Sequence, residues 1–316
     1  MLQYNNAFRA ALRGKFYCWA LLLPVTLALL ALPTHTDARE LAIVTSIKPL
    51  HMIAQAVMGK DATLARIVPD GADAHDYILR PSDAEKATQS DLLIWLGPLA
   101  EPYLARVAAR PSLVQLDISQ IPDLMLLPQR RLVEWDEKTA AHAHNTPFDQ
   151  HLWLNTENAK RIANAIAKRI AELDPANAER YKKNADEFAL SIDSHIPNWK
   201  SAFANVNSNY FIAYHDAYHY LEQEFGLHVA TVLTLEPEIK PGAKHLLNVK
   251  SAIDEHKVTC FVTEPGYDPR LLEKVMPDAA KQVVLDVHGS GITISKDSYI
   301  NFMGTIINSL SQCLRK

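Results

Sequence analysis

The sequence predicts an α/β protein with two lobes, each a mostly parallel sheet flanked by helices, joined by a long rigid helix. Short apolar, β-branched runs alternate with helical patterns on both sides of residue 174, which is typical of parallel sheets with buried strands. Between the two alternating regions, 176–204 is one long helical pattern in which apolar residues recur every three or four positions. These observations predict a linking helix at 174–205.

The first lobe is predicted to span residues 39–173. We expect its strands at 41–46, 64–68, 91–96 and 113–116, and its helices at 49–58, 83–89, 99–109 and 158–173. The turn formers Pro69-Asp70-Gly71 follow the second strand, which we expect to be buried, and they place His75 on a loop at a strand end. Ser82 is expected to cap the helix that follows this loop. Ligands of open α/β sheets bind at such strand ends.

Residues 121–150 interrupt the alternation with three prolines and mixed charges, so we expect a long, flexible surface loop. Two histidines near its end, His142 and His144, could hold a metal or could be solvated side chains of the loop. His151 follows the loop directly and precedes an apolar corner and a helix start, with Asn155 or Thr156 as its cap. Asp149 or a backbone carbonyl could orient the His151 ring.

The second lobe, predicted at 206–316, repeats this plan. We expect strands at 210–214, 229–235, 258–263 and 282–287, and helices at 217–225, 244–256, 269–275 and 296–313. The first of these strands ends at His215 and the third at Glu264. Asp286 lies near the end of the fourth strand, and His288 follows it by two residues.

Residues 1–38 are predicted to be a signal peptide. Three basic residues precede an apolar run at 19–32, and small or polar residues follow up to Ala38. The alternative is an uncleaved membrane anchor, because the apolar run approaches spanning length. Cleavage would leave a chain without a further spanning segment, which we expect in the periplasm.

Charge and cysteine content narrow the class of protein further. The chain has 32 Lys and Arg against 36 Asp and Glu, a net charge of −4, whereas a nucleic-acid binder would be basic. Two cysteines lie beyond the predicted signal peptide, Cys260 in a strand and Cys313 in the last helix. In an exported protein such a pair most often forms a disulfide, which would tie the C-terminus to the sheet.

Three histidines share one property: His75, His151 and His215 each lie in a loop at, or just beyond, the end of a regular element. Loops at strand ends of two lobes can converge, and three imidazoles with one carboxylate form a suitable tetrahedral Zn²⁺ set. Asp286 and Glu264 are the acidic residues at strand ends of the second lobe. The four predicted ligands are far apart in the sequence, so their spacing does not test the set.

Several local motifs contain these residues. They are Pro69-Asp70-Gly71, His75-Asp76-Tyr77, Arg80-Pro81-Ser82-Asp83, His151-Leu152-Trp153-Leu154, Tyr214-His215-Asp216-Ala217-Tyr218, Thr263-Glu264-Pro265 and Leu285-Asp286. In this order they resemble the periplasmic zinc-binding proteins of zinc-uptake ABC transporters, and the resemblance covers the whole chain after the predicted signal peptide.

The resemblance implies His75, His151 and His215 as metal ligands, with Asp286 as the acidic fourth candidate. Histidine at the third position, where manganese-binding relatives carry glutamate, favours Zn²⁺. Some zinc-binding members have glutamate before the first histidine, and here that position is Ala74, so Asp286 or a water must complete the shell. Accessory roles fall to the remaining candidates, which are Glu264, His288, His142 and His144. The Cys260–Cys313 pair also looks like the disulfide of some zinc-binding members.

The function implied by the resemblance is that of a monomeric solute-binding protein, not an enzyme. It would capture Zn²⁺ in a cleft between the lobes and deliver it to an ABC transporter permease in the inner membrane, with modest lobe movement because the linking helix is stiff. Manganese or iron is the alternative ion. A zinc-dependent hydrolase with Glu264 as general base is the alternative of another class, although the sequence has no His-Glu-x-x-His motif. A surface adhesin on the same scaffold is a third possibility.

Overall fold

The computed structural model places residues 41–316 in one compact unit. It describes residues 41–59, 64–72, 74–130, 146–206, 208–234, 241–268 and 270–315. The predicted signal peptide, residues 1–38, lies outside the described residues, as do His142 and His144. Among the described helices, none has the length and apolar character needed to cross a bilayer.

The first four strands form one parallel sheet in the order β2-β1-β3-β4. Their bounds are β1 Ile43–Thr45, β2 Leu64–Arg66, β3 Leu92–Trp95 and β4 Gln115–Asp117. Central strands β1 and β3 are buried along their whole length, as their continuous apolar sequence predicts. The predicted burial of strand 64–68 is wrong for β2 itself, which is half-buried at the edge of the sheet, whereas Ile67 and Val68, which follow it, are buried.

The second sheet repeats this topology with the order β6-β5-β7-β8, again parallel. Its strands are β5 Tyr210–Ala213, β6 His228–Val232, β7 Cys260–Thr263 and β8 Lys281–Val284. In both sheets the first strand in sequence has neighbours on both sides, and ligands of open sheets bind outside the strand ends where the strand order reverses. The edge strand β8 ends at Val284, earlier than predicted, so Asp286 lies in the turn that follows.

Helices accompany both sheets, as the alternating pattern predicts. Their bounds are α1 Lys48–Met58, α2 Pro81–Gln89, α3 Pro102–Ala108, α5 Thr156–Leu173, α6 Ala178–Ala202, α7 His219–Phe225, α8 Ala243–His256, α9 Arg270–Glu273 and α10 Ser298–Leu314, with 3-10 turns η1 Ile118–Gln120, η2 Leu152–Leu154 and η3 Pro175–Asn177.

The predicted N-cap residue is confirmed for α5 and is wrong for α2. The Asn155 side chain accepts a hydrogen bond from the N–H of Asn158 and caps α5, one of the two predicted caps. The prediction that Ser82 caps α2 is wrong, because the helix begins earlier, after Arg80. Pro81 explains the early start: its fixed φ suits the first turn, where its missing N–H costs no helical bond.

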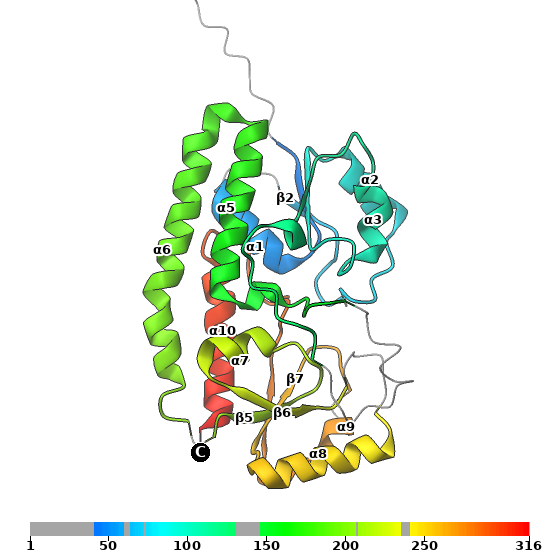
Figure 1. The fold of residues 1–316 in the computed structure, drawn as a ribbon, viewed down its shortest axis with the longest axis vertical. Coiled ribbons are helices and arrows are strands. Elements are labelled where there is room, and N and C mark those ends of the chain that lie inside the picture. Colours follow the sequence, from blue (N-terminus) through cyan, green and yellow to red (C-terminus); the bar gives the residue numbers. More distant parts are fainter. Residues whose placement is uncertain are drawn as a thin grey trace, which may run out of the picture. The chain divides into compact units, whose positions relative to one another are not determined.

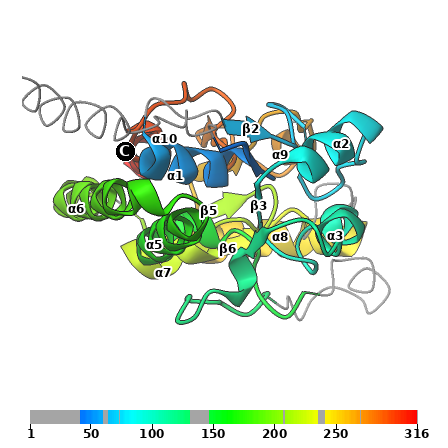
Figure 2. The same cartoon turned by 90° about the horizontal axis from the view of Figure 1, so that it is seen from above.

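The long helix α6 has 25 residues and forms a helical hairpin with α5, visible from two directions (Figures 1 and 2). It also packs against α1, which follows β1, and α10, which follows β8, so it contacts elements of both lobes. Its predicted apolar stripe is buried through Tyr181, Ala185, Phe188 and Ile192.

One apolar core runs through both lobes. Buried residues from β1, β3, α1, α5, α6, β5 and α10 belong to a single cluster. A smaller cluster fills the space between the second sheet and α8, around Ile212, Phe261 and Val249. The predicted disulfide is confirmed: Cys260 in β7 bonds to Cys313 in α10 and ties the last helix to the second sheet.

Candidate metal centre

His75 lies in the loop that leads from β2 to α2. Gly71 adopts a left-handed φ of 77°, which glycine accepts without steric cost, so the chain turns near the start of this loop, four residues before His75. The His75 side chain is half-buried, and Tyr77, two residues further on, donates a 2.6 Å hydrogen bond from its hydroxyl to Asp83 in α2. The part of the loop that follows His75 is therefore attached to α2 in the first lobe.

His151 precedes the 3-10 turn η2 and is 4% exposed. Asp149 fixes it twice: its Oδ1 accepts from the His151 backbone N–H at 2.8 Å and lies 2.9 Å from the ring Nδ1. The edge-on Trp153 ring lies 5.4 Å from the imidazole, between ring centres. With Nδ1 committed to a carboxylate, Nε2 is the ring nitrogen suited to bind a metal.

His215 immediately follows β5 and Tyr214, and is 2% exposed. Its Nδ1 lies 2.5 Å from Oε1 of Glu264, the residue that follows β7, the neighbouring strand in the sheet. Tyr218 donates from its hydroxyl to the same carboxylate oxygen at 3.2 Å. The carboxylate thus orients His215 as Asp149 orients His151.

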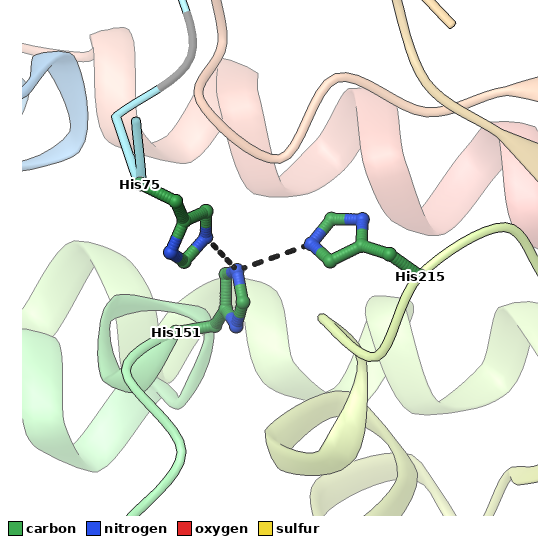
Figure 3. Close-up of side chains that lie close together, drawn as sticks. All are labelled: His75, His151 and His215. Carbon is green, nitrogen blue, oxygen red and sulfur yellow. Dashed lines mark hydrogen bonds between the residues drawn. The ribbon is translucent and has the colours of Figure 1, made fainter. Parts of the chain in front are cut away.

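The three imidazoles converge on one point (Figure 3). Nε2 of His151 lies 3.3 Å from Nε2 of His75 and 3.4 Å from Nε2 of His215. A tetrahedral zinc ion with Zn–N bonds of about 2.0–2.1 Å separates its ligand nitrogens by about 3.3–3.4 Å. All three residues offer a ring nitrogen within 4.8 Å of the others. The two separations from His151 therefore match edges of a zinc coordination tetrahedron, and the third pair lies within 4.8 Å.

Other predicted site residues lie outside this cluster. Asp286 does not join the group of atoms within 4.8 Å; its carboxylate accepts hydrogen bonds from the N–H groups of His288, Gly289 and Ser290. His288 contacts the Trp153 ring at 5.6 Å between ring centres, one side chain away from His151. The fourth-ligand role of Asp286 and the accessory role of His288 stay predictions.

Buried acids make the surroundings of the three histidines suited to a cation. Burial raises the pKa of Asp149 to about 6, although the His151 N–H favours its charged form. Burial also raises the pKa of Asp216, next to His215, against the opposing charge of Arg130. At both carboxylates burial outweighs the positive charge nearby, and a divalent cation at the imidazoles would favour their charged forms.

Arg130 is a part of the site that sequence reasoning missed. Its guanidinium pairs with Asp216 at 3.2 Å and with Glu222 in α7, and so joins the base of the 121–150 loop to the second lobe. Arg130, Asp149, His151 and Asp216 line a small shared pocket. A basic residue at the edge of a loop gives no signal in the sequence that its partner is an acid 86 positions away.

Comparison with known proteins shows which family this sequence resembles. A family model described as ZnuA, "Zinc-uptake complex component A periplasmic", matches residues 43–313. The high-affinity zinc uptake system protein ZnuA of Yersinia pestis is 33% identical over 290 residues, covering 87% of this chain and 91% of the relative. The protein of the same name from Brucella suis is 30% identical over 306 residues, covering 87% and 92%.

Solved structures agree in fold. A ZnuA deletion mutant with zinc bound superposes with a TM-score of 0.73 at 19% identity, covering 88% of this chain and 99% of that one. A mutant of the laminin-binding adhesin Lmb from Streptococcus agalactiae gives a TM-score of 0.74 at 21% identity, covering 87% and 100%. Both likenesses concern the arrangement of the two sheets and the long helix.

Proposed function

Since the chain belongs to the ZnuA family of periplasmic zinc-uptake components, we propose that it captures Zn²⁺ between its two lobes with His75, His151 and His215. The observation that carries this proposal is the convergence of the three Nε2 atoms at tetrahedral spacing. The captured ion is then delivered to the permease of an ABC transporter. As a member of this family the chain is a transport component and not an enzyme.

Asp286 is the proposed fourth ligand, with water as the alternative. Its Oδ1 accepts from two backbone N–H groups and its Oδ2 from one, which leaves Oδ2 a lone pair for the ion. Replacement by asparagine separates the two, because its oxygen can still accept from the His288 and Gly289 N–H groups while the charge is lost. A ligand role predicts a large loss of zinc affinity in Asp286→Asn, whereas water in the fourth position predicts a small change.

Ligand chemistry supports Zn²⁺ over Mn²⁺ or iron as the transported ion. Imidazole nitrogen suits Zn²⁺, whereas Mn²⁺ prefers carboxylate and other oxygen ligands. The two carboxylates nearest the imidazoles, Asp149 and Glu264, are turned towards the Nδ1 atoms and so orient the rings. Glu264 therefore has a role as the partner of His215, and the role of a general base is not needed to explain its position.

The pH dependence of capture follows from the ligands. A zinc-binding imidazole must be neutral, and an unperturbed histidine has a pKa of about 6.5. Protons therefore compete with zinc as the pH falls, and we expect capture to weaken below about pH 6.

The proposal also covers export, location and oligomeric state. Residues 1–38 serve as a signal peptide, the remaining chain works in the periplasm as a monomer, and its permease partner lies in the inner membrane. A monomer suffices because all three histidines come from one chain. Mass determination of the secreted protein would test both the cleavage near Ala38 and the monomeric state.

Lobe movement on binding is proposed to be modest. The apolar core that continues from β1 through α1, α6 and α10 supports this, because opening the lobes widely would expose buried apolar surface. Small-angle scattering with and without zinc would reveal a large compaction if the expectation were mistaken.

Competitive titration tests the main proposal. The metal-free protein, without residues 1–38, is titrated with Zn²⁺ and Mn²⁺ against a chelating dye of known affinity. We expect one tightly bound Zn²⁺ per chain, much weaker Mn²⁺ binding, and a large loss of zinc affinity in His151→Ala. Unchanged zinc binding in His151→Ala would overturn the proposed site.

A further inference from the structure

The two lobes meet at a second place, next to the His75 loop. Lys48, the first residue of α1, is 7% exposed, and its Nζ donates a 2.6 Å hydrogen bond to the backbone carbonyl of Ser290. The same Nζ lies 3.2 Å from a carboxylate oxygen of Asp70, and the N–H of Gly71 donates to the Ser290 hydroxyl at 3.4 Å. We call Lys48, Asp70 and Ser290 the interlobe clasp.

On the second lobe, the turn that carries Ser290 is firmly held. Asp286 accepts hydrogen bonds from the three backbone N–H groups up to Ser290, at 3.0, 2.8 and 2.5 Å. Gly289 has a φ of 69°, and a Cβ there would meet Met52 of α1 at 2.5 Å and Phe302 of α10 at 2.8 Å. The Ser290 carbonyl is therefore presented to Lys48 from a fixed position.

On the first lobe, the contacts of the interlobe clasp hold the start of the His75 loop. Asp70 also pairs with Arg66 at 2.8 Å, so two cations of the first lobe fix it. His75 is the least buried of the three histidines, whereas His151 and His215 are buried and have carboxylates beside their Nδ1 atoms. His151 lies in the same lobe as His75, whereas His215 lies in the second lobe, so the contacts of the loop with Ser290 bear on the distance between His75 and His215.

We propose that Lys48 is a positioning residue for zinc: through Asp70 and Ser290 it seats the His75 loop against the second lobe and sets the rate at which the ion leaves. This rests on the proposed function of the three histidines. A ligand that is in place only part of the time lowers the apparent affinity by that fraction. Loss of a buried, charge-assisted hydrogen bond corresponds to about a 10- to 100-fold change, which we expect in the zinc dissociation rate.

The effect of Lys48 on the rate of zinc dissociation is tested by a chelator chase in a stopped-flow instrument. Zinc-loaded wild type, Lys48→Met and Asp70→Asn are mixed with excess chelator, and association rates are measured separately. We expect faster release in both variants, with association changed less than about threefold, because the remaining ligands are intact. Lys182→Met, an exposed lysine on α6 paired with Asp186, is the matched control and should release zinc at the wild-type rate.

Hydrogen exchange provides a second measurement, taken first on the metal-free protein. In Lys48→Met we expect faster exchange of the Gly71 and Ala72 amides, unchanged exchange in the second sheet, and recovery of protection when zinc is added. Wild-type release in both clasp variants, or unaltered exchange at Gly71, would overturn the clasp. Failure of the wild type to bind zinc would instead refute the proposed function, while the metal-free exchange would still test the clasp.

Discussion

Replacing Asp149 by asparagine should stabilise the metal-free protein and weaken zinc binding at the same time. The asparagine side chain would keep an oxygen that can accept from the His151 backbone and ring but would remove the buried charge. Burial raises the Asp149 pKa from 3.8 to about 6, so the folded state holds this proton more tightly than the unfolded state. The contribution of Asp149 to stability therefore falls as the pH rises from about 4 through about 6.

The magnitude follows from that shift. A difference of about two pKa units corresponds to about 3 kcal/mol of unfolding free energy at pH 7.5, and the asparagine variant escapes this cost. Zinc binding changes in the opposite direction, because the ligand loses a charged partner that raises its basicity. Such partners contribute about 10- to 100-fold to metal affinity, or about 1.4–2.7 kcal/mol.

Two assays at pH 7.5 measure the two effects. Urea unfolding with a chelator present gives the stability of the metal-free protein, and competition with a chelating dye gives the zinc affinity. Asp193→Asn is the control, since Asp193 is an exposed residue of α6 that pairs with Lys160 of α5, and its replacement should alter neither value by much. An Asp149→Asn variant that binds zinc as tightly as the wild type, or unfolds more easily without metal, would refute the reasoning.

Three further predictions concern stability. Burial lowers the pKa of His51 to about 4, so the unfolded state takes up this proton first and the His51 contribution to stability falls by about 3 kcal/mol from pH 6.5 to pH 4. In urea unfolding, the stability of His51→Gln relative to the wild type should rise by about this amount over the same range. Burial raises the pKa of Glu101 to about 7, so its contribution to stability rises as the pH falls from 7 to 4.5. Over this range the wild type should gain stability relative to Glu101→Gln, and a constant difference between the two would contradict the assignment. Replacing Cys260 and Cys313 together by alanine should lower the unfolding free energy by about 4 kcal/mol, since the disulfide closes a loop over 53 positions; equal unfolding of this variant and the oxidised wild type would count against it.

The sequence was sufficient for the fold class. Apolar runs at β1, β3, β5 and β7 are continuous because these strands are buried on both faces, and this pattern is readable without coordinates. The edge strands were predicted less well, since β2 is only half-buried and β8 ends before Asp286. Burial of an edge strand depends on what covers it, which local sequence does not specify.

Within the site, some features depend on neighbouring residues in the sequence and others on contacts between distant residues. The placement of His75, His151 and His215 at element ends follows from turn formers, caps and strand lengths near each residue. Asp149 was also a predicted partner, because it lies two positions before His151. Glu264 beside His215 and Ser290 beside Lys48 are contacts across 49 and 242 positions, and no periodicity connects such residues.

By itself, the sequence determined two parallel sheets, a long helix between them, and which three histidines stand at the ends of elements. Only the tertiary structure decided that their Nε2 atoms lie 3.3 and 3.4 Å apart, that Asp286 holds a turn outside this cluster, and that Lys48 bridges the lobes. The physical reason is that hydrophobic periodicity acts over a few residues, whereas coordination requires positions set to tenths of an ångström by packing between distant segments.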